Sequence, residues 1–421
     1  MSVNLYAARA WVACLVAIAV AGEACAQAPA AESALSLRDA FARALSDAPA
    51  VKAADQALVG AEAGIRQADR MPNPTLDIAA ENLLGSGLYS GLSRAETTVG
   101  MSQRLEWGED RQARTNLATA DLAIARAGGD IRRQNLLHEV ELAYLAAQKA
   151  DADLQVALQK VEVANEIVAT VKRRVDAARD PLMAGAKAQA VLVEAQIGAD
   201  TARRASDAAK ARLASFWGGG VAVDFTVDTA SFDAVGSSAG NTANLNPELG
   251  LASAAVERAA AALSVERARA EPDPTISAGF RYFHETDEAA LVVGISIPLQ
   301  VWDRNDGAVI RAEAERSRLR YENEALRRNI EREANTAQSQ MKIAKAEVDA
   351  IEEQLLPAAE QALAFARQGY NAGGFSYLDV LDAQRLVVDA RLQRNSALYS
   401  FHSARVALAR LTGVYANGSA Q

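Results

Sequence analysis

The feature that most constrains the fold is the length of two helical patterns, at 109–179 and 308–368. The first contains no proline and only the glycines Gly128 and Gly129, and the second contains no glycine and one proline, Pro357. At ~1.5 Å per residue, each stretch predicts a helix on the order of 90–105 Å long. The first also has apolar residues at every seventh position, the spacing of a coiled coil: Leu154, Val161, Val168 and Val175. We therefore expect an elongated, mainly α protein.

The chain also contains one pattern twice. Pro72-Asn73-Pro74-Thr75-Leu76 returns 200 residues later as Pro272-Asp273-Pro274-Thr275-Ile276. Further matches follow in the same order at offsets of 188 to 195 residues: Val99-Gly100-Met101-Ser102 with Val293-Gly294-Ile295-Ser296, Ala195-Gln196 with Ala383-Gln384, and Phe216-Trp217-Gly218 with Leu411-Thr412-Gly413. The ordered matches predict a tandem duplication.

Each half follows one plan. A long opening helix is expected over Leu37–Arg70 and again over Glu248–Glu271, and the Pro-x-Pro signal ends it because proline lacks the amide hydrogen. Alternating apolar and polar residues then predict two strands per half, at about 75–105 and 275–300. A long helix and a returning helix complete each half, the latter expected over Lys187–Phe216 and Tyr377–Leu411.

The four expected strands leave two interpretations open. They could form ordinary hairpins that cover a soluble core. Alternatively, strands of about 8–11 residues are long enough to cross a bilayer when tilted. Four strands cannot close a membrane barrel, and lipid does not tolerate open sheet edges. Transmembrane strands would therefore require an oligomer.

The N-terminus has the pattern of an export signal. Arg9 precedes an apolar run over 10–21, and Ala24-Cys25-Ala26 supplies a cleavage site, so we expect a signal peptide at 1–26. A membrane anchor and lipoprotein processing with acylation of Cys25 remain alternatives. Both cysteines of the chain, Cys14 and Cys25, lie in this segment, so a chain cleaved after Ala26 would contain no thiol.

Composition and motifs argue against several classes of function. The net charge of -9 argues against a nucleic-acid-binding protein, which needs a basic face. No phosphate loop, nucleophile elbow or acid–base pair is present, so we expect no enzyme, no cofactor and no resident metal. The three histidines, His138, His284 and His402, are interpreted as packing or surface residues.

Three stretches resemble the TolC-type outer-membrane efflux family, and most of all its heavy-metal (cobalt-zinc-cadmium) branch: Arg70–Leu76, Ile297–Gly307 and Ser376–Gln384. The resemblance covers nearly the whole mature chain. It implies long α-helical coiled-coil hairpins plus four transmembrane strands per chain, with a homotrimer that forms a 12-stranded β-barrel and an α-helical periplasmic tunnel. The implied domains are a first repeat at 27–217, a linker at 218–246, a second repeat at 247–413 and a tail at 414–421.

The resemblance also implies location, partners and cargo. It places the protein in the outer membrane of a Gram-negative bacterium, extending into the periplasm. The implied partners are outer-membrane lipid, a periplasmic adaptor protein and an inner-membrane pump of the resistance–nodulation–division (RND) class. The expected function is an exit duct for heavy-metal cations such as cobalt, zinc and cadmium. A multidrug or type I secretion duct and, more distantly, a soluble periplasmic coiled-coil scaffold remain alternatives.

The turns between long helices are the expected docking and gating sites. The resemblance assigns adaptor docking to the turns around Gly185 and around Gly373, Gly374 and Ser376. Ser376 is placed to cap the returning helix, with Asp379 three residues on. The resemblance also assigns gate aspartates to Asp379 and Asp382, which share a helix face. Alternatively, the two acids only stabilise the helix N-terminus or face solvent.

One tryptophan follows the second strand of each half. Tryptophan favours the membrane–water interface, so we expect Trp107 and Trp302 to form an aromatic girdle on the periplasmic side. Ordinary packing between barrel and helices is the alternative.

Overall fold

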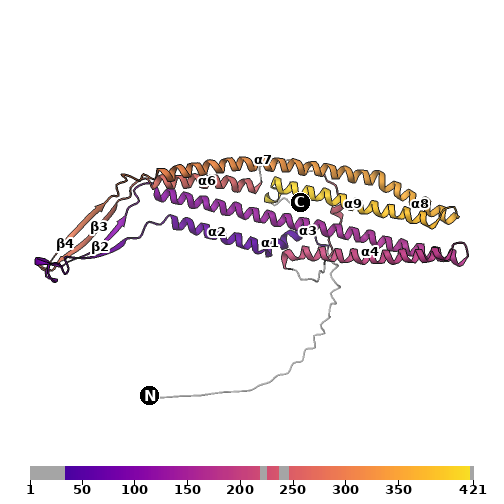
Figure 1. Cartoon of the computed structure of the whole chain (residues 1–421), viewed down its shortest axis with the longest axis horizontal. Coiled ribbons are helices and arrows are strands. Elements are labelled where there is room, and N and C mark those ends of the chain that lie inside the picture. The colour runs from indigo at the N-terminus through magenta and orange to yellow at the C-terminus, as the bar shows by residue number, and fades with distance from the viewer. Residues whose placement is uncertain (1–33, 219–224, 237–245, 418–421) are drawn as a thin grey trace, which may run out of the picture.

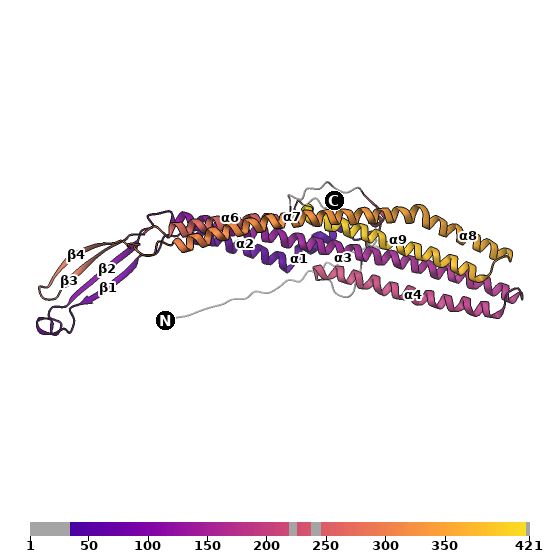
Figure 2. The same cartoon turned by 45° about the horizontal axis from the view of Figure 1, so that its top comes forward.

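The molecule is elongated, with a four-stranded sheet at one end and two helical hairpin tips at the other (Figures 1 and 2). The computed structural model describes residues 34–218, 225–236 and 246–417. The expected signal peptide at 1–26, with Cys25, lies outside the described residues. Helices dominate the described residues, which confirms the mainly α fold with a small β part.

The first half contains four helices: α1 (Leu37–Asp47), α2 (Pro49–Ala68), α3 (Asp110–Asp176) and α4 (Leu182–Ala214). The 67-residue α3 confirms the first long pattern. The single opening helix expected over Leu37–Arg70 is wrong. Ala48 adopts an extended conformation and Pro49 starts a new helix at its first position, where a missing N–H costs no hydrogen bond.

The second half contains α6 (Pro247–Ala268) before its strands and α7 (Asp306–Ala350), α8 (Leu356–Ala372) and α9 (Tyr377–Thr412) after them. One uninterrupted helix over 308–368 was expected, but a π-helical turn at Ile351–Leu355 joins α7 to α8. Pro357 explains the interruption, because it cannot donate to the carbonyl four residues earlier and its ring crowds that turn.

Short elements occupy the connections. A four-residue helix, α5 (Ala230–Asp233), lies in the segment between the halves, and Val227 forms a parallel bridge with Leu35. Three 3-10 turns complete the described elements: η1 (Gly87–Tyr89), η2 (Ser215–Trp217) and η5 (Val414–Asn417).

The sheet combines one hairpin from each half. Its strands are β1 (Thr75–Glu81), β2 (Glu96–Arg104), β3 (Thr275–Phe283) and β4 (Glu288–Ser296), and they are antiparallel in the order β1-β2-β3-β4. The β2–β3 seam joins the halves and sets Gly100 directly opposite Gly279. A Cβ on Gly279 would lie 2.7 Å from the Cα of Gly100, so position 279 needs glycine, whereas a Cβ on Gly100 would make a tight contact of 3.0 Å with the carbonyl oxygen of Ala278.

The core is a string of small apolar clusters along the helices. One surrounds Tyr144 near the middle of the molecule, and another near the hairpin tips contains Val171, Tyr370 and Tyr377. Val168 and Val175 pack against the cluster near the tips, and Val161 packs against a further cluster of Ala164, Leu192 and Ala195, as the seven-residue spacing predicts. Alanine is frequent at the buried positions, which lets the helices approach closely. Across the described part of the chain, no helix combines the length and the apolar character that crossing a membrane would require.

Candidate functional site: the exposed sheet and the hairpin tips

One face of the sheet is apolar and exposed. Residues paired directly across the strands share a face, and the register sets Ile78, Val99, Phe280 and Leu291 in one row. The next row contains Leu76, Met101, Ala278 and Val293, and the Val293 side chain is 71% exposed. Large exposed apolar patches mark contact with a partner or a membrane.

The opposite face is polar and joined by ion pairs. Arg281 lies in the middle of it, with its guanidinium 3.0 Å from Glu81 and 3.1 Å from Glu96. On the same face, the Ser102 hydroxyl donates to the Asp77 carboxylate at 2.6 Å. The ion pairs of Arg281 join the two halves, and the Ser102–Asp77 bond joins the two strands of the first half, so the polar face is stabilised by side chains as well as by the backbone ladder.

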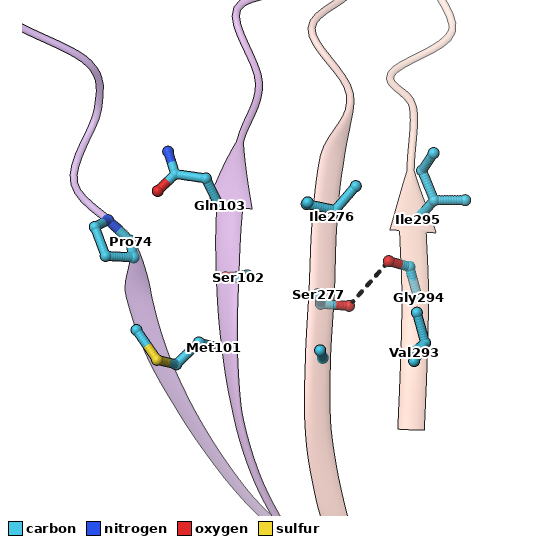
Figure 3. Close-up of a pocket in the computed structure, with 10 residues that line it drawn as sticks. Pro74, Met101, Ser102, Gln103, Ile276, Ser277, Val293, Gly294 and Ile295 are labelled. Carbon is cyan, nitrogen blue, oxygen red and sulfur yellow. Dashed lines mark hydrogen bonds between the residues drawn. The ribbon is translucent and has the colours of Figure 1, made fainter. Parts of the chain in front are cut away.

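A shallow pocket lies over β2, β3 and β4 where the sheet approaches the helices (Figure 3). The walls are mostly apolar, with Met101, Ile276, Val293 and Ile295 among the lining residues. At its edge, the Ser277 hydroxyl donates to the carbonyl of Gly294 at 3.3 Å. The pocket is a local hollow of the sheet and holds no cluster of ionisable side chains.

The two tryptophans lie at the junction of sheet and helices, and both are exposed. Trp107 is 76% exposed and Trp302 is 96% exposed, so neither is core within one chain. The Trp107 amide donates to the Asp273 carboxylate at 3.3 Å, and Arg104 forms an ion pair with the same carboxylate at 3.1 Å. The second residue of Pro272-Asp273-Pro274 therefore ties the end of β2 to the start of β3.

The second hairpin tip is a tight glycine turn followed by a capped helix. Gly373 ends α8 in the left-handed conformation with φ of 83°, which glycine adopts without steric cost. The Ser376 side chain and the Asp379 carboxylate form a complete capping box at the start of α9, as predicted. The hydroxyl and amide of Ser376 both donate to Asp379 at 2.7 Å, and these bonds lower the pKa of that carboxyl.

The other residues predicted for the tips lie near this turn or on the neighbouring hairpin. Asp382 lies one turn into α9, with a carboxylate 75% exposed and Arg385 3.9 Å away. Gly374 follows the left-handed Gly373 and donates to the carbonyl of Gly369 at 2.9 Å. Gly185 lies near the start of α4 rather than in the loop between α3 and α4. The structure thus brings Gly373, Gly374, Ser376 and the two aspartates together, with Gly185 on the neighbouring hairpin.

The two tips are joined by a cluster of three residues that we term the tip latch: Arg174, Asp180 and Tyr370. Arg174 holds Asp180 with two hydrogen bonds, Nε to Oδ2 at 2.9 Å and Nη2 to Oδ1 at 3.1 Å. The Tyr370 hydroxyl donates to the same carboxylate at 2.7 Å. Arg174 also donates to the Tyr370 carbonyl at 3.0 Å, with its guanidinium 4.5 Å from the centre of the Tyr370 ring.

The contacts of the latch shift the pKa values of two of its members. The hydrogen bonds from Arg174, and then the one from Tyr370, lower the pKa of Asp180, so the carboxylate stays ionised. Burial and the bond to that carboxylate raise the pKa of Tyr370 to about 12, so the phenol keeps its proton. Ion pairs that combine two parallel hydrogen bonds with partial burial are the stronger ones in proteins. The Arg174–Asp180 pair lies within the first hairpin, and the bonds of both residues to Tyr370 link it to the second hairpin.

Sequence reasoning did not identify the latch. Arg174 and Asp180 flank the first turn, and a charged pair on both sides of a turn was the available signal. Tyr370 lies 190 positions from Asp180, and no local pattern connects the two residues.

Within the described ranges, no group of three or more His, Cys, Asp or Glu side chains is arranged to hold a metal ion. His402 is buried, with Nε2 2.8 Å from the carbonyl oxygen of Phe232, and its ring stacks on that phenylalanine. Burial lowers the pKa of His402. This histidine packs α9 against α5.

The arrangement of a sheet at one end and two long helical hairpins at the other is found in solved outer-membrane channels. The structure of CusC superposes with a TM-score of 0.74 at 19% identity, covering 90% of this chain and 92% of that one. VceC of Vibrio cholerae superposes with a TM-score of 0.70 at 22% identity, covering 90% and 96%. The fold is therefore that of an outer-membrane channel protein.

The chain belongs to the outer membrane efflux protein family, whose model matches residues 40–219 and 240–414. It is an outer-membrane protein that extends into the periplasm. The cobalt-zinc-cadmium resistance protein CzcC of Cupriavidus metallidurans is 30% identical over 373 residues, 86% of each chain. The nickel-cobalt-cadmium resistance protein NccC of Alcaligenes xylosoxydans xylosoxydans is 30% identical over 287 residues, 66% of this chain and 65% of that protein.

Proposed function

We propose that the chain is the outer-membrane exit duct of a tripartite RND-type efflux system, and that its cargo is heavy-metal cations such as cobalt, zinc and cadmium. The observation that carries the cargo is the 30% identity to CzcC over 86% of both chains. The duct catalyses no reaction, and energy comes from the inner-membrane pump. The periplasmic adaptor docks at the hairpin tips around Gly185 and around Gly373, Gly374 and Ser376.

The duct is a homotrimer in this proposal. Each half, 27–217 and 247–413, supplies one strand hairpin and one long helix pair. The exposed apolar row with Val293 contacts lipid, while the polar row with Arg281 lines the pore. Trp107 and Trp302 then lie at the periplasmic membrane interface. The exposure of both tryptophans and of the apolar rows supports this orientation.

A deletion tests the cargo. Cells without the gene should become sensitive to zinc, cobalt, cadmium or nickel, because the cations would no longer leave the periplasm. Growth inhibition is measured across these metals, copper, silver and a panel of antibiotics, with the restored gene as control. Sensitivity to antibiotics and detergents alone would contradict the metal cargo and leave the duct architecture in place.

The gate aspartates are tested by conductance. In the trimer, Asp379 and Asp382 place six carboxylates near the axis, where rings of acids attract cations. Block of the pore by divalent cations should weaken in Asp379→Asn/Asp382→Asn, with a blocking concentration about tenfold higher for each ~1.4 kcal/mol of binding lost. Single-channel recording in a planar bilayer measures the block.

Two matched variants sharpen this experiment. Asp382→Asn alone keeps the capping box, because only Asp379 bonds to Ser376. Asp389→Asn removes an exposed acid two turns further along α9 and should leave the block unchanged. Equal block in the double variant and in the unsubstituted pore would remove the gate assignment.

A further inference from the structure

The apolar face of the sheet contains a hollow over β2, β3 and β4, which we term the Ala278 hollow (Figure 3). Its walls include the side chains of Met101, Ile276, Val293 and Ile295. The hollow encloses about 590 Å³, and small-molecule sites in proteins commonly enclose roughly 300–1,000 Å³. It is therefore large enough to take up part of a flexible apolar molecule.

The hollow forms because a small side chain lies between larger ones. Ala278 is paired with Met101 on β2 and with Val293 on β4. On either side of Ala278 along β3, the same face carries Ile276 and Phe280. Alanine has a single side-chain carbon, so the surface dips at Ala278 while its four larger neighbours stand around it.

The first half of the chain has no small residue at the equivalent position. The two Pro-x-Pro signals relate β1 to β3 by a shift of 200 positions, so the counterpart of Ala278 on β1 is Ile78. The counterpart of Phe280 is Ala80. A branched side chain therefore stands on β1 at the level where β3 has only a methyl group, and the repeat does not copy the conditions that form the hollow.

The position of the hollow indicates what covers it. In the proposed duct the polar face with Arg281 lines the pore, so the hollow opens toward lipid. β3 is flanked on both sides by strands of its own chain, so pairing at the sheet edges would leave the hollow open. It extends from Val293, near the middle of β4, to Pro74 beside the helical end of β1. It therefore lies on the side of Trp107 and Trp302 and faces the inner leaflet.

We propose that the Ala278 hollow binds one acyl chain of an inner-leaflet phospholipid in each copy of the protein. The inference rests on the proposed outer-membrane duct and adds a lipid site to it. The walls are mostly apolar and a methylene chain forms no hydrogen bonds, so no polar group loses a partner on binding. The chain is flexible enough to fill an irregular hollow. Contact with walls on several sides gives more dispersion energy than a flat sheet surface does, so this lipid should leave more slowly than its neighbours.

Retention of lipid by the purified trimer tests the site. The protein is reconstituted in phosphatidylethanolamine vesicles, extracted into detergent and weighed as an intact trimer by mass spectrometry. One phospholipid per copy should remain after detergent has replaced the lipid on the open surface. Ala278→Leu fills the hollow with a branched side chain, as Ile78 does on β1. Retention should then fall by on the order of tenfold, which corresponds to ~1.4 kcal/mol of binding lost.

The same face of the sheet offers a matched control. Ala80→Leu adds the same bulk to an apolar row nearer the outer end of the sheet, away from the residues that line the hollow. Retention should be unchanged in this variant. Trimers that keep no phospholipid, or that keep it equally in Ala278→Leu and Ala80→Leu, would overturn the site and leave the duct in place. Monomers by mass without phospholipid would overturn the duct and the site together.

A phosphatidylethanolamine with a diazirine in its acyl chain locates the lipid in the unsubstituted protein, and this result stands even if Ala278→Leu assembles poorly. After extraction into detergent, crosslinks should map to the tryptic peptide 270–281, which contains Ile276 and Ala278, rather than to the peptide 71–94, which contains Ile78. Crosslinks spread equally over both peptides would overturn the site. In trimers purified directly from outer membranes, lipopolysaccharide in place of phospholipid would overturn the assignment to the inner leaflet.

Discussion

Val293→Arg should reduce the amount of assembled trimer in the outer membrane by at least an order of magnitude. Val293 lies near the middle of β4 on the exposed apolar face, 71% exposed. An arginine on the lipid face near the bilayer midplane costs about 2–4 kcal/mol. Every trimer carries the substitution three times. Trimer is quantified on gels of outer-membrane fractions, and folding free energy is measured by urea titration in liposomes.

The chain provides a matched control for this experiment in the next residue. Val292 is also a valine of β4, but it belongs to the row of Asp77, Gly100 and Gly279 on the polar face. Val292→Arg would point into the water-filled pore beside two glycines, so assembly should be nearly normal. Equal loss of trimer in both variants would mean that the faces are assigned wrongly.

Asp180→Asn should loosen the two hairpin tips. The substitution keeps the shape of the side chain and removes the charge that accepts two bonds from Arg174 and one from Tyr370. Hydrogen bonds to charged groups contribute about 1.5–3 kcal/mol. Amide hydrogen exchange around 173–181 and 369–377 should therefore accelerate by roughly 10- to 150-fold, since about 1.4 kcal/mol corresponds to tenfold.

Two variants separate the latch from a general effect of substitution at the tip. Tyr370→Phe removes one hydrogen bond but keeps the ring beside Arg174, so its effect should be smaller. Asp176→Asn removes an exposed acid near the same turn and should leave exchange unchanged. If Asp180→Asn exchanged like Asp176→Asn, the latch would not hold the tips together.

Strong acid should loosen the hairpin tips as Asp180→Asn does, because protonation removes the same negative charge. Because the pKa of Asp180 is lowered in the folded protein, the contribution of this carboxylate is complete above the ordinary aspartate pKa of about 3.9. It is lost as the pH falls below that value and through the lowered folded pKa. Exchange at the tips should thus be constant around neutral pH and should rise only in strong acid.

Much of the architecture could be predicted from local patterns. Pro72-Asn73-Pro74 and Pro272-Asp273-Pro274 each precede a strand, and the alternation that follows gave four strands with approximate boundaries. The long patterns without helix breakers predicted α3 and α7. The capping box of Ser376 and Asp379 was also visible, because it involves residues three apart. Each of these features depends on neighbours within a few positions.

Pro49 and Pro357 were the residues at which local reading failed. Pro49 starts α2 after an extended Ala48, so the opening helix is two helices. Pro357 follows a π-helical turn rather than ending the helix. A proline restricts one backbone angle and removes one donor, but whether the chain breaks, kinks or widens there depends on the packing of the neighbouring helices.

By itself, the sequence determined the element types, the repeat, the exposed apolar strand faces and the family. Three contacts could be seen only in the folded chain: the pairing of β2 with β3, the bond from the Trp107 amide to Asp273, and the bond from Tyr370 to Asp180. The physical reason is range. Periodicity and capping act between residues within one or two turns, whereas these contacts join residues 166 and 190 positions apart, which meet only after the long helices fold back on one another.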